Sequence, residues 1–247
     1  MARVLLFSLV VSAGFVLGGF LPGFDFGASK HALIIKARTE EVGILESIEA
    51  YYQTYGRFPV SSNVQNCATA AKSDFTYGGT FRDRHGLSIR VSSEPASPLL
   101  TNDEVIAILM DITNFIVNGQ CTVNAGHQLN PKQIIFLNAK LSGDTTSDGV
   151  GTDLVYRDPW GNPYVITMNL KDDNQCQDAF YRGQAVSQKD GTNGYFGLFN
   201  RADTNGKGSH FAFKGRVMIW SAGPDGRIDP TKSAVDNPNR DNILSWN

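Results

Sequence analysis

Residues 30–56, KHALIIKARTEEVGILESIEAYYQTYG, carry the strongest structural pattern in this chain. Apolar side chains recur there every three or four positions, so they share one face of a helix that packs on a core, while charged residues fall mostly elsewhere. Because Gly56 suits the position after a helix and Pro59 stops one, we predict about seven helical turns from Ser29. The apolar face is expected to comprise Ile35, Val42, Leu45, Ile48, Tyr52 and Tyr55.

Upstream lies an uncharged and mostly apolar stretch, VLLFSLVVSAGFVLGGFL, at residues 4–21. A bilayer needs about 17–25 residues of helix, so we expect a retained membrane anchor, with a cleaved signal peptide as the alternative. Positive charge at Arg3 predicts that the rest of the chain faces away from the cytoplasm. Pro22 is expected to break or kink the helix, which divides the chain into a membrane segment with a hinge at 1–29 and a head at 30–247.

The composition is that of an ordinary folded protein. Of 247 residues, 41% are hydrophobic and 19% charged, so the chain can bury a sizeable core. The 22 basic and 24 acidic residues form no basic cluster, and we expect no nucleic-acid partner. Cys67, Cys121 and Cys176 allow at most one internal disulfide, and their spacing fits neither a CxxC pair nor a zinc site. One bridge and three free thiols are equal alternatives.

A second helix is predicted after residue 100. Thr101 or Asn102 can cap its first turn, and the two acidic residues that follow favour the positive end of the helix dipole. Gly119 is expected to end it. The predicted buried face consists of Val105, Ile106, Leu109 and Ile112.

Three short apolar runs bounded by turn residues predict a small, mainly antiparallel sheet, with strands at 133–139, 163–170 and 215–223. Residues 61–100 are expected to form turns and short strands, and the aromatic-rich residues 191–215 a hairpin that packs on its own sheet. The whole pattern predicts an α+β fold. In it, a long N-terminal helix, hydrophobic and then amphipathic, packs on the sheet, and loop-rich insertions surround them.

The last predicted strand runs into IWSAGPDGRIDP, residues 219–230, where glycine and proline supply a tight turn and carboxylates follow. Carboxylates held close together repel one another, and calcium takes about six to eight hard oxygen ligands from loops of this kind. A bound calcium ion would therefore stabilise the closed loop, whereas a solvated acidic loop is the alternative. The candidate metal ligands are Ser221, Asp225, Asp229, Asp236 and Asp241.

The sequence contains no recognisable catalytic motif. It has no GxSxG elbow, P-loop, HExxH motif or dinucleotide fingerprint, and its 4 histidines stand apart in polar sequence. A hydrolase that uses carboxylates such as Asp83 or Asp103 is the enzymatic alternative, but no paired-acid geometry can be assigned to them. We therefore predict that the protein is not an enzyme.

Three landmarks occur together in the chain. They are YYQTYGRFP at 51–59, DPWGNPYVI at 158–166, and SAGPDG at 221–226 followed by DNILSW at 241–246. In these motifs, their order and their spacing, the chain resembles the major pseudopilin of type II secretion and related type IV pilin-like proteins. The resemblance covers residues 1–59 and part of the remainder, and it leaves apparent insertions near 61–130 and 171–210.

The second landmark is expected to be a structural turn. Its residues are Asp158, Pro159, Trp160 and Gly161, followed by Pro163. Proline at the second position of a tight turn presets its backbone, and the later proline redirects the chain into a strand. The large side chain of Trp160 is expected to lock the turn onto the core.

The resemblance also implies a calcium site. In this family a calcium ion organises the loop between a Gly-x-Asp-Gly turn and a later Asp-Ile-x-x-Trp. Asp225 matches the first acid and Asp241 the second, with Asn242 as an extra residue after it. The implied supporting ligands are Ser221, Asp229 and Asp236.

The resemblance implies a structural subunit or accessory of a type II secretion pseudopilus or type IV pilus-like assembly. It would sit in the cytoplasmic membrane with its head in the periplasm or at the cell surface, and contact its own copies or other pilin-like subunits. Leu5 or Gly19 stands where the family has a glutamate, and no basic leader precedes residues 4–21. The alternative is a membrane-anchored or secreted module of the same fold that binds a ligand or partner without polymerising.

Overall fold

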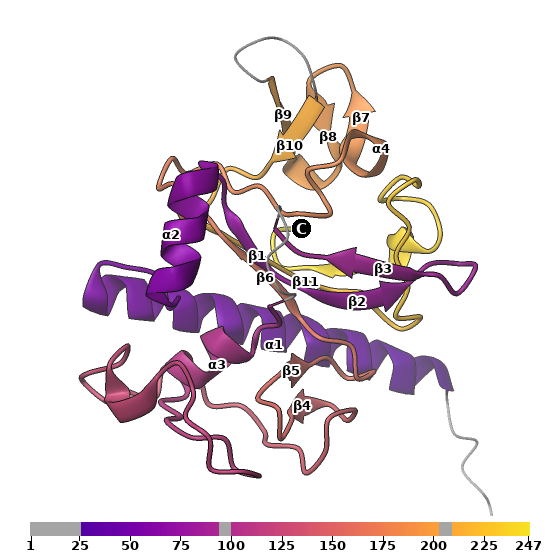
Figure 1. The fold of residues 1–247 in the computed structure, drawn as a ribbon. Coiled ribbons are helices and arrows are strands. Elements are labelled where there is room, and N and C mark those ends of the chain that lie inside the picture. Colours follow the sequence, from indigo (N-terminus) through magenta and orange to yellow (C-terminus); the bar gives the residue numbers. More distant parts are fainter. Residues whose placement is uncertain (1–25, 94–99, 203–208) are drawn as a thin grey trace, which may run out of the picture.

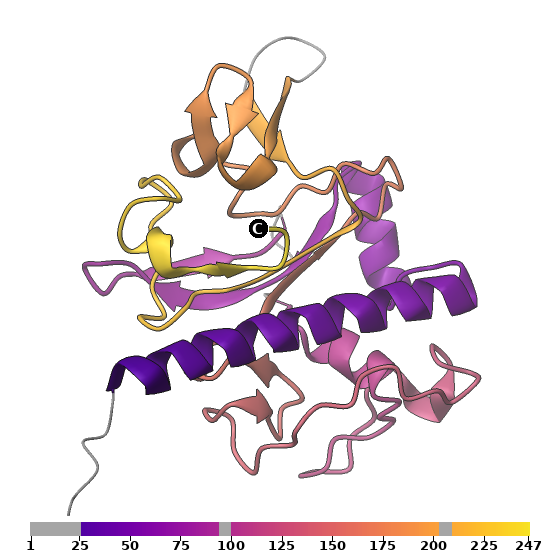
Figure 2. The same cartoon turned by 180° about the vertical axis from the view of Figure 1, so that it is seen from behind.

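The long helix predicted from the sequence is present. The computed structural model describes residues 26–93, 100–202 and 209–247, and its first element is α1, Phe26–Tyr55. Gly56 follows with a φ of 66°, and its N–H bonds to a carbonyl in the last turn at 2.8 Å, which closes the helix. α1 runs across the whole molecule (Figure 1, Figure 2).

The predicted core face of α1 is confirmed in part, because Ile48 is buried and Leu45, Tyr52 and Tyr55 pack against the core. Ile35 and Val42 are 52% and 46% exposed, so the prediction was wrong for these two residues. The buried row consists of Ala37, Glu41, Ile44, Ile48 and Tyr51. A glutamate stands in the middle of this row, and two large apolar side chains stand on the solvent face. Hydrophobicity alone therefore indicated the core side of α1 along its second half and misplaced these two residues.

α1 lies on a four-stranded antiparallel sheet of order β1-β6-β11-β12. Its strands are β1 (Phe75–Tyr77), β6 (Val165–Met168), β11 (Val217–Ser221) and β12 (Ile243–Leu244). The strands predicted at 163–170 and 215–223 are confirmed by β6 and β11, which pair with Ile166 opposite Ile219. Because β1 comes from residues 61–100, that region supplies one strand of the central sheet and is not only an insertion at its surface.

Both faces of this sheet are buried, because alternate side chains of β6 and β11 enter two separate clusters. Ile166 and Ile219 pack in one cluster with Ile48 of α1. Trp220 belongs to the other cluster, where its ring lies 5.4 Å from that of Phe180. The sheet is therefore the middle layer, with α1 on one side and loops and short strands on the other (Figure 1).

Shorter elements fill the connections. Beside the sheet lie α2 (Ser62–Ala71) and the hairpin of β2 (Gly79–Arg82) and β3 (Ser88–Val91). Below α1 in Figure 1 lie α3 (Asp103–Leu109), β4 (Gly149–Val150) and β5 (Tyr156–Arg157). A second antiparallel sheet contains β7 (Gln188–Asp190), β8 (Asn193–Gly194), β9 (Phe199–Ala202) and β10 (Ser209–Ala212), with α4 (Gln184–Ser187) nearby. Single 3₁₀ turns occupy η1 (Ala125–His127), η2 (Tyr195–Gly197) and η3 (Asn239–Asp241).

The second predicted helix is shorter than expected. α3 ends at Leu109 instead of Gly119, and the chain turns away at Asp111, which has a φ of 56°. Neither Thr101 nor Asn102 caps α3 through its side chain. The Asn102 amide instead makes three buried hydrogen bonds of 2.8–2.9 Å to the backbone beside β5 and β6. α2, which the sequence did not predict, starts at a Ser61 side-chain cap.

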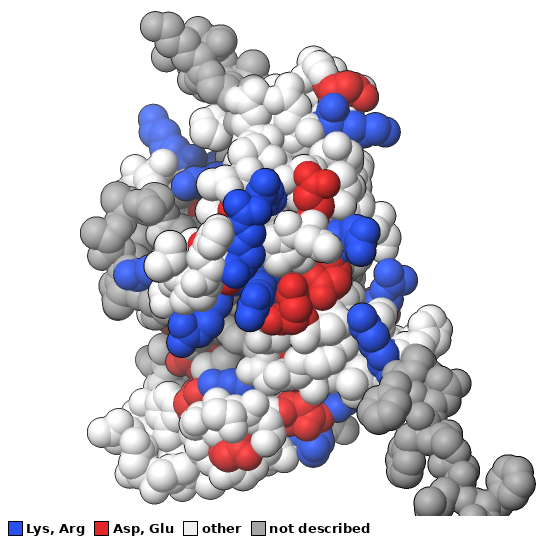
Figure 3. Space-filling model, turned by 90° about the vertical axis from the view of Figure 1, so that its right-hand side faces the viewer, with Lys and Arg blue, Asp and Glu red and all other residues white. Residues whose placement is uncertain are grey.

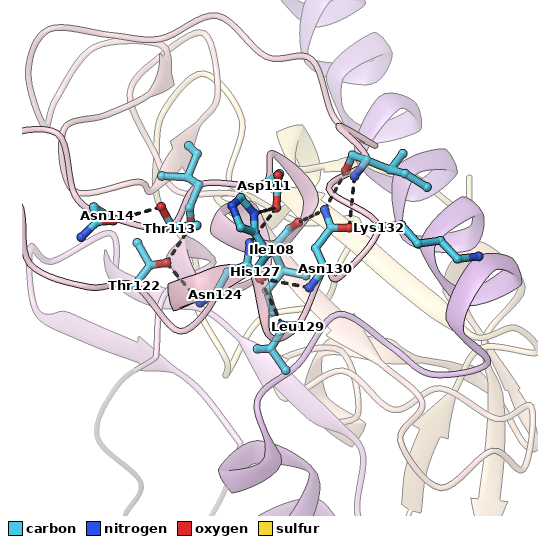
Figure 4. Close-up of polar contacts among 12 residues, drawn as sticks. Ile108, Asp111, Thr113, Asn114, Thr122, Asn124, His127, Leu129, Asn130 and Lys132 are labelled. Atoms are coloured by element: carbon cyan, nitrogen blue, oxygen red, sulfur yellow. Dashed lines mark hydrogen bonds and ion pairs between the residues drawn. The ribbon is translucent and has the colours of Figure 1, made fainter.

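A polar network replaces the strand predicted at 133–139 (Figure 4). Asp111 accepts hydrogen bonds from Asn124 at 3.0 Å and from His127 at 2.8 Å. Asn130 donates to backbone carbonyls on either side of it at 3.2 and 2.7 Å. Asn130 and the carbonyl at the end of α3 satisfy backbone groups of the apolar run without a strand partner. The run packs along α1, where the Ser47 hydroxyl donates to its backbone at 2.9 Å.

The predicted anchor at 4–21 and the kink at Pro22 lie outside the described residues. Among the helices of residues 26–93, 100–202 and 209–247, none is both long and apolar enough to cross a membrane. The membrane segment is therefore a prediction from the sequence alone.

All three cysteines are free thiols in the structure, which decides between the two alternatives left by the sequence. Cys67 and Cys121 are exposed and Cys176 is buried. Burial raises the pKa of the Cys176 thiol well above its usual value, so it stays protonated as a core side chain.

Charged side chains of both signs are interspersed on the face shown in Figure 3. Blue basic groups form a run down the middle of this face, and red acidic groups lie directly beside it.

Candidate functional site

The loop between β11 and β12 begins with a turn that requires glycine. Gly223 and Gly226 have φ values of 67° and 61°. A Cβ on Gly223 would lie 2.2 Å from the Asp241 carbonyl oxygen, so the two ends of the loop approach each other closely. This approach brings two of the predicted metal ligands together.

Those two ligands are Asp225 and Asp241. Burial raises the pKa of the Asp241 carboxyl, and the negative charge of Asp225 raises it further. Burial also raises the pKa of Asp225. Because the folded loop disfavours both negative charges, a divalent cation bound between them would stabilise it.

The other predicted ligands have different partners. The Ser221 hydroxyl donates to Asp158 at 2.5 Å and accepts from the Gly223 N–H at 2.9 Å. Asp229 accepts from both the backbone and the hydroxyl of Thr231, at 2.9 and 2.6 Å. Asp236 is exposed. Of the predicted ligands, Asp225 is the one whose charge raises the pKa of Asp241, whereas Ser221 bonds to Asp158 and Asp229 bonds to Thr231.

The Asn239 side chain holds the segment around Asp229 in place, where the sequence predicted a bound cation. The Asn239 side chain is buried, and its amide donates to the carbonyls of Asp229 and Lys232, each at 2.9 Å. Its oxygen accepts from the Asp229 N–H at 2.8 Å. Asn239 was not predicted, because one asparagine in a polar stretch gives no signal that distinguishes it from a surface residue.

Asp225 and Asp241 could supply part of the ligand shell of a calcium ion. In the described residues no group of three or more His, Cys, Asp or Glu side chains is placed to hold a metal ion. Asp225 and Asp241 can offer carboxylate oxygens, and the rest of the about six to eight ligands would have to be loop carbonyls and water. Any site here is therefore an open one built on two acids.

The predicted structural turn supports the start of this loop. Asp158 is fully buried, and its carboxylate accepts from the backbone N–H groups of Trp160 and Asn162, each at 2.9 Å. The Ser221 hydroxyl bonds to the same carboxylate. The Asn162 amide also donates to the Gly223 carbonyl at 3.2 Å, so one turn holds both the end of β11 and the glycine that follows it.

The tryptophan of this turn does not have its predicted role. Trp160 is only partly buried and belongs to neither hydrophobic cluster, whereas Trp220 of β11 is fully buried. The turn is secured by the Asp158 hydrogen bonds and by contacts of its neighbours. Gly161 has a φ of 89° and a Cβ there would lie 2.3 Å from a backbone oxygen, while Pro163 packs against Gly79.

A buried glutamate lies beside this turn. Glu41 of α1 is 1% exposed, and neither of its carboxylate oxygens has a hydrogen-bond partner within the described residues. Burial raises the pKa of Glu41 well above its usual value, and the nearby charge of Asp158 raises it further. The positive charge of Arg38 offsets only part of this effect. The fold therefore disfavours the charged form of Glu41.

Comparisons of the chain with protein-family models, curated proteins and solved structures give no match. The functional conclusion therefore depends on the motifs in the sequence and on the geometry described above.

Proposed function

We propose that this protein is a non-enzymatic, pilin-like structural subunit or accessory of a type II secretion pseudopilus or type IV pilus-like assembly. The observation that carries the proposal is the arrangement of α1, the antiparallel sheet and the β11–β12 loop. A long first helix lies on the sheet, the backbones of Gly223 and Asp241 approach closely where the loop closes, and burial and the charge of Asp225 raise the pKa of Asp241. Residues 4–21 would hold the chain in the cytoplasmic membrane, with the head outside the cytoplasm.

The solvent face of α1 supports self-association. Ile35 and Val42 are seven residues apart, so they lie on the same side of the helix about two turns apart. Each exposes about half of its surface, at 52% and 46%. Large apolar side chains on an exposed helix face are suited to contact with a second helix, and repetition of that contact builds a filament.

Ile35→Glu and Val42→Glu are each expected to abolish assembly of the full chain without unfolding the head, because a charge would be buried at each contact between subunits. The measurement is electron microscopy of filaments after detergent removal, with melting temperatures as a check on folding. Leu87→Glu is the matched control, because Leu87 is 65% exposed but lies in the turn between β2 and β3.

Filaments that persist in both α1 variants would contradict the role of this face. A wild-type chain that stays monomeric under all conditions would contradict assembly itself. It would favour the alternative in which the protein binds a partner without polymerising.

Calcium is expected to raise the melting temperature of the full chain. At a concentration 100 times its Kd, a ligand stabilises the folded state by about 2.7 kcal/mol, which corresponds to roughly 5–10 °C for a chain of this size. Asp225→Asn and Asp241→Asn should each remove the shift between excess calcium and chelator. Asp236→Asn is the control, because Asp236 is an exposed acid of the same loop.

If calcium still raises the melting temperature of both Asp225→Asn and Asp241→Asn, these two acids are not the calcium site. An equal loss in Asp236→Asn would show that calcium acts through the general charge of the loop.

A further inference from the structure

Three arginines lie where the turn between β2 and β3 meets the β11–β12 loop. Arg82 of β2 and Arg227 of the loop are partners in a parallel β-bridge, and the Ile228 N–H donates to the Arg82 carbonyl at 3.0 Å. Residues opposite each other in a bridge project to the same side, so these two exposed side chains are neighbours. Arg84 follows in the turn, and its side chain is 50% exposed. We call Arg82, Arg84 and Arg227 the arginine edge.

Little of the charge of the arginine edge is neutralised by the protein. The Arg82 guanidinium donates to the Gly86 carbonyl at 3.0 Å, which leaves its charge uncompensated. Among the residues that the structure describes, no acid forms an ion pair with Arg82 or Arg227. Arg84 lies 3.7 Å from the carboxylate of Asp229. The edge is therefore suited to an anionic partner, and a guanidinium binds phosphate oxygens through paired N–H donors.

A large apolar side chain stands in the same turn. Leu87 is 65% exposed, and the turn is closed by the Asp83 carboxylate, which accepts from the N–H groups of His85 and Leu87, each at 2.8 Å. Basic groups beside an exposed apolar tip suit the boundary between lipid headgroups and acyl chains, where phosphates meet the cations and the apolar tip leaves water. A soluble polyanion would use the arginines but would gain nothing from Leu87.

The arginine edge lies at the end of the molecule where α1 begins. The β2–β3 turn, the β11–β12 loop and the first turns of α1 share this end in both views of the fold (Figure 1, Figure 2). Figure 3 looks onto it and shows basic side chains in a run there. Lys30 follows Leu21, the last residue of the predicted membrane segment, by nine residues, which span at most about 32 Å. A membrane anchor would therefore hold this end of the head next to the bilayer.

We propose that the arginine edge docks the head on anionic phospholipid headgroups, with the arginines on lipid phosphates and Leu87 at the boundary with the acyl chains. The inference rests on the membrane segment of the proposed function and not on filament assembly or on the calcium site. Each basic residue close to an anionic surface raises the affinity about fivefold. Asp225, which accepts from the Arg227 N–H at 2.8 Å, opposes this attraction, so calcium bound in the loop would strengthen docking.

Sedimentation with liposomes tests the proposal, with the full chain held in nanodiscs of neutral phosphatidylcholine and with chelator present. The chain is expected to bind liposomes that contain phosphatidylglycerol, and added salt should weaken this binding. The double variant Arg82→Gln and Arg227→Gln should bind about 25-fold more weakly, and Leu87→Ser about fivefold more weakly. The matched control is Lys72→Gln with Lys189→Gln, which removes the same charge from exposed positions after α2 and in β7.

Arg82 and Arg227 are exposed, so the double variant should keep the melting temperature of the wild type, which separates loss of docking from loss of folding. The docking proposal alone is overturned if the inserted chain does not distinguish anionic from neutral liposomes, or if the double variant binds as well as the wild type. Unchanged binding of Leu87→Ser overturns it in favour of a soluble polyanion as partner. A chain that does not enter the nanodiscs contradicts the membrane segment and, with it, both the proposed function and the docking.

Discussion

Asp158→Ala is expected to lower the free energy of unfolding by about 3–4 kcal/mol, because it leaves several buried donors without an acceptor. The Asp158 carboxylate accepts from the N–H groups of Trp160 and Asn162 at 2.9 Å and from the Ser221 hydroxyl at 2.5 Å. All of these bonds converge on a side chain that is 0% exposed.

Urea unfolding of the full chain measures this effect, with two further variants as controls. Asp144 makes a similar local turn, because its carboxylate accepts from the backbone N–H groups of Thr146 and Ser147, each at 2.7 Å, but it is exposed. Asp144→Ala should therefore lower the free energy of unfolding much less than Asp158→Ala. Asp158→Asn keeps one oxygen acceptor, so its free energy of unfolding should lie between those of the wild type and Asp158→Ala. Equal losses for Asp158→Ala and Asp144→Ala would contradict a special role for the buried turn.

The parts of the fold that the sequence predicts are those in which local pattern and tertiary environment agree. α1 ends at Gly56 because glycine adopts the required positive φ without strain. β6 and β11 are continuous apolar runs of the length of a strand, and each is buried on both faces. The Asp158 turn was assigned a structural role from its turn chemistry, and its buried hydrogen bonds explain that role.

The predictions that were wrong concern places where a long-range contact decides the structure. On α1, hydrophobicity could not predict the burial of Glu41 or the exposure of Ile35 and Val42. Residues 133–139 have the composition of a strand, but Asn130 and α1 satisfy and cover them. Asp229 stands near Asp225 in sequence, yet its loop is closed through Asn239.

Glu41→Gln is expected to make the protein more stable at neutral pH, and the gain should grow as the pH rises. The folded-state pKa of Glu41 lies well above the unfolded value of 4.5, mainly because of burial. Its contribution to stability is therefore fully present below pH 4.5 and is lost as the pH rises towards the folded pKa. Over that interval the wild type loses about 1.4 kcal/mol per pH unit relative to a variant that cannot ionise.

Urea unfolding of the wild type and Glu41→Gln from pH 4 to pH 8, with chelator present, tests this expectation. The difference in the free energy of unfolding should be small near pH 4 and should widen through neutral pH, because glutamine has the shape of the protonated acid. Glu46→Gln controls for the removal of one negative charge from the exposed side of the same helix. If the difference between wild type and Glu41→Gln stays constant with pH, or if the wild type is the more stable protein at pH 8, then Glu41 is ionised in the folded state. It would then have to be compensated by a cation bound beside Asp158.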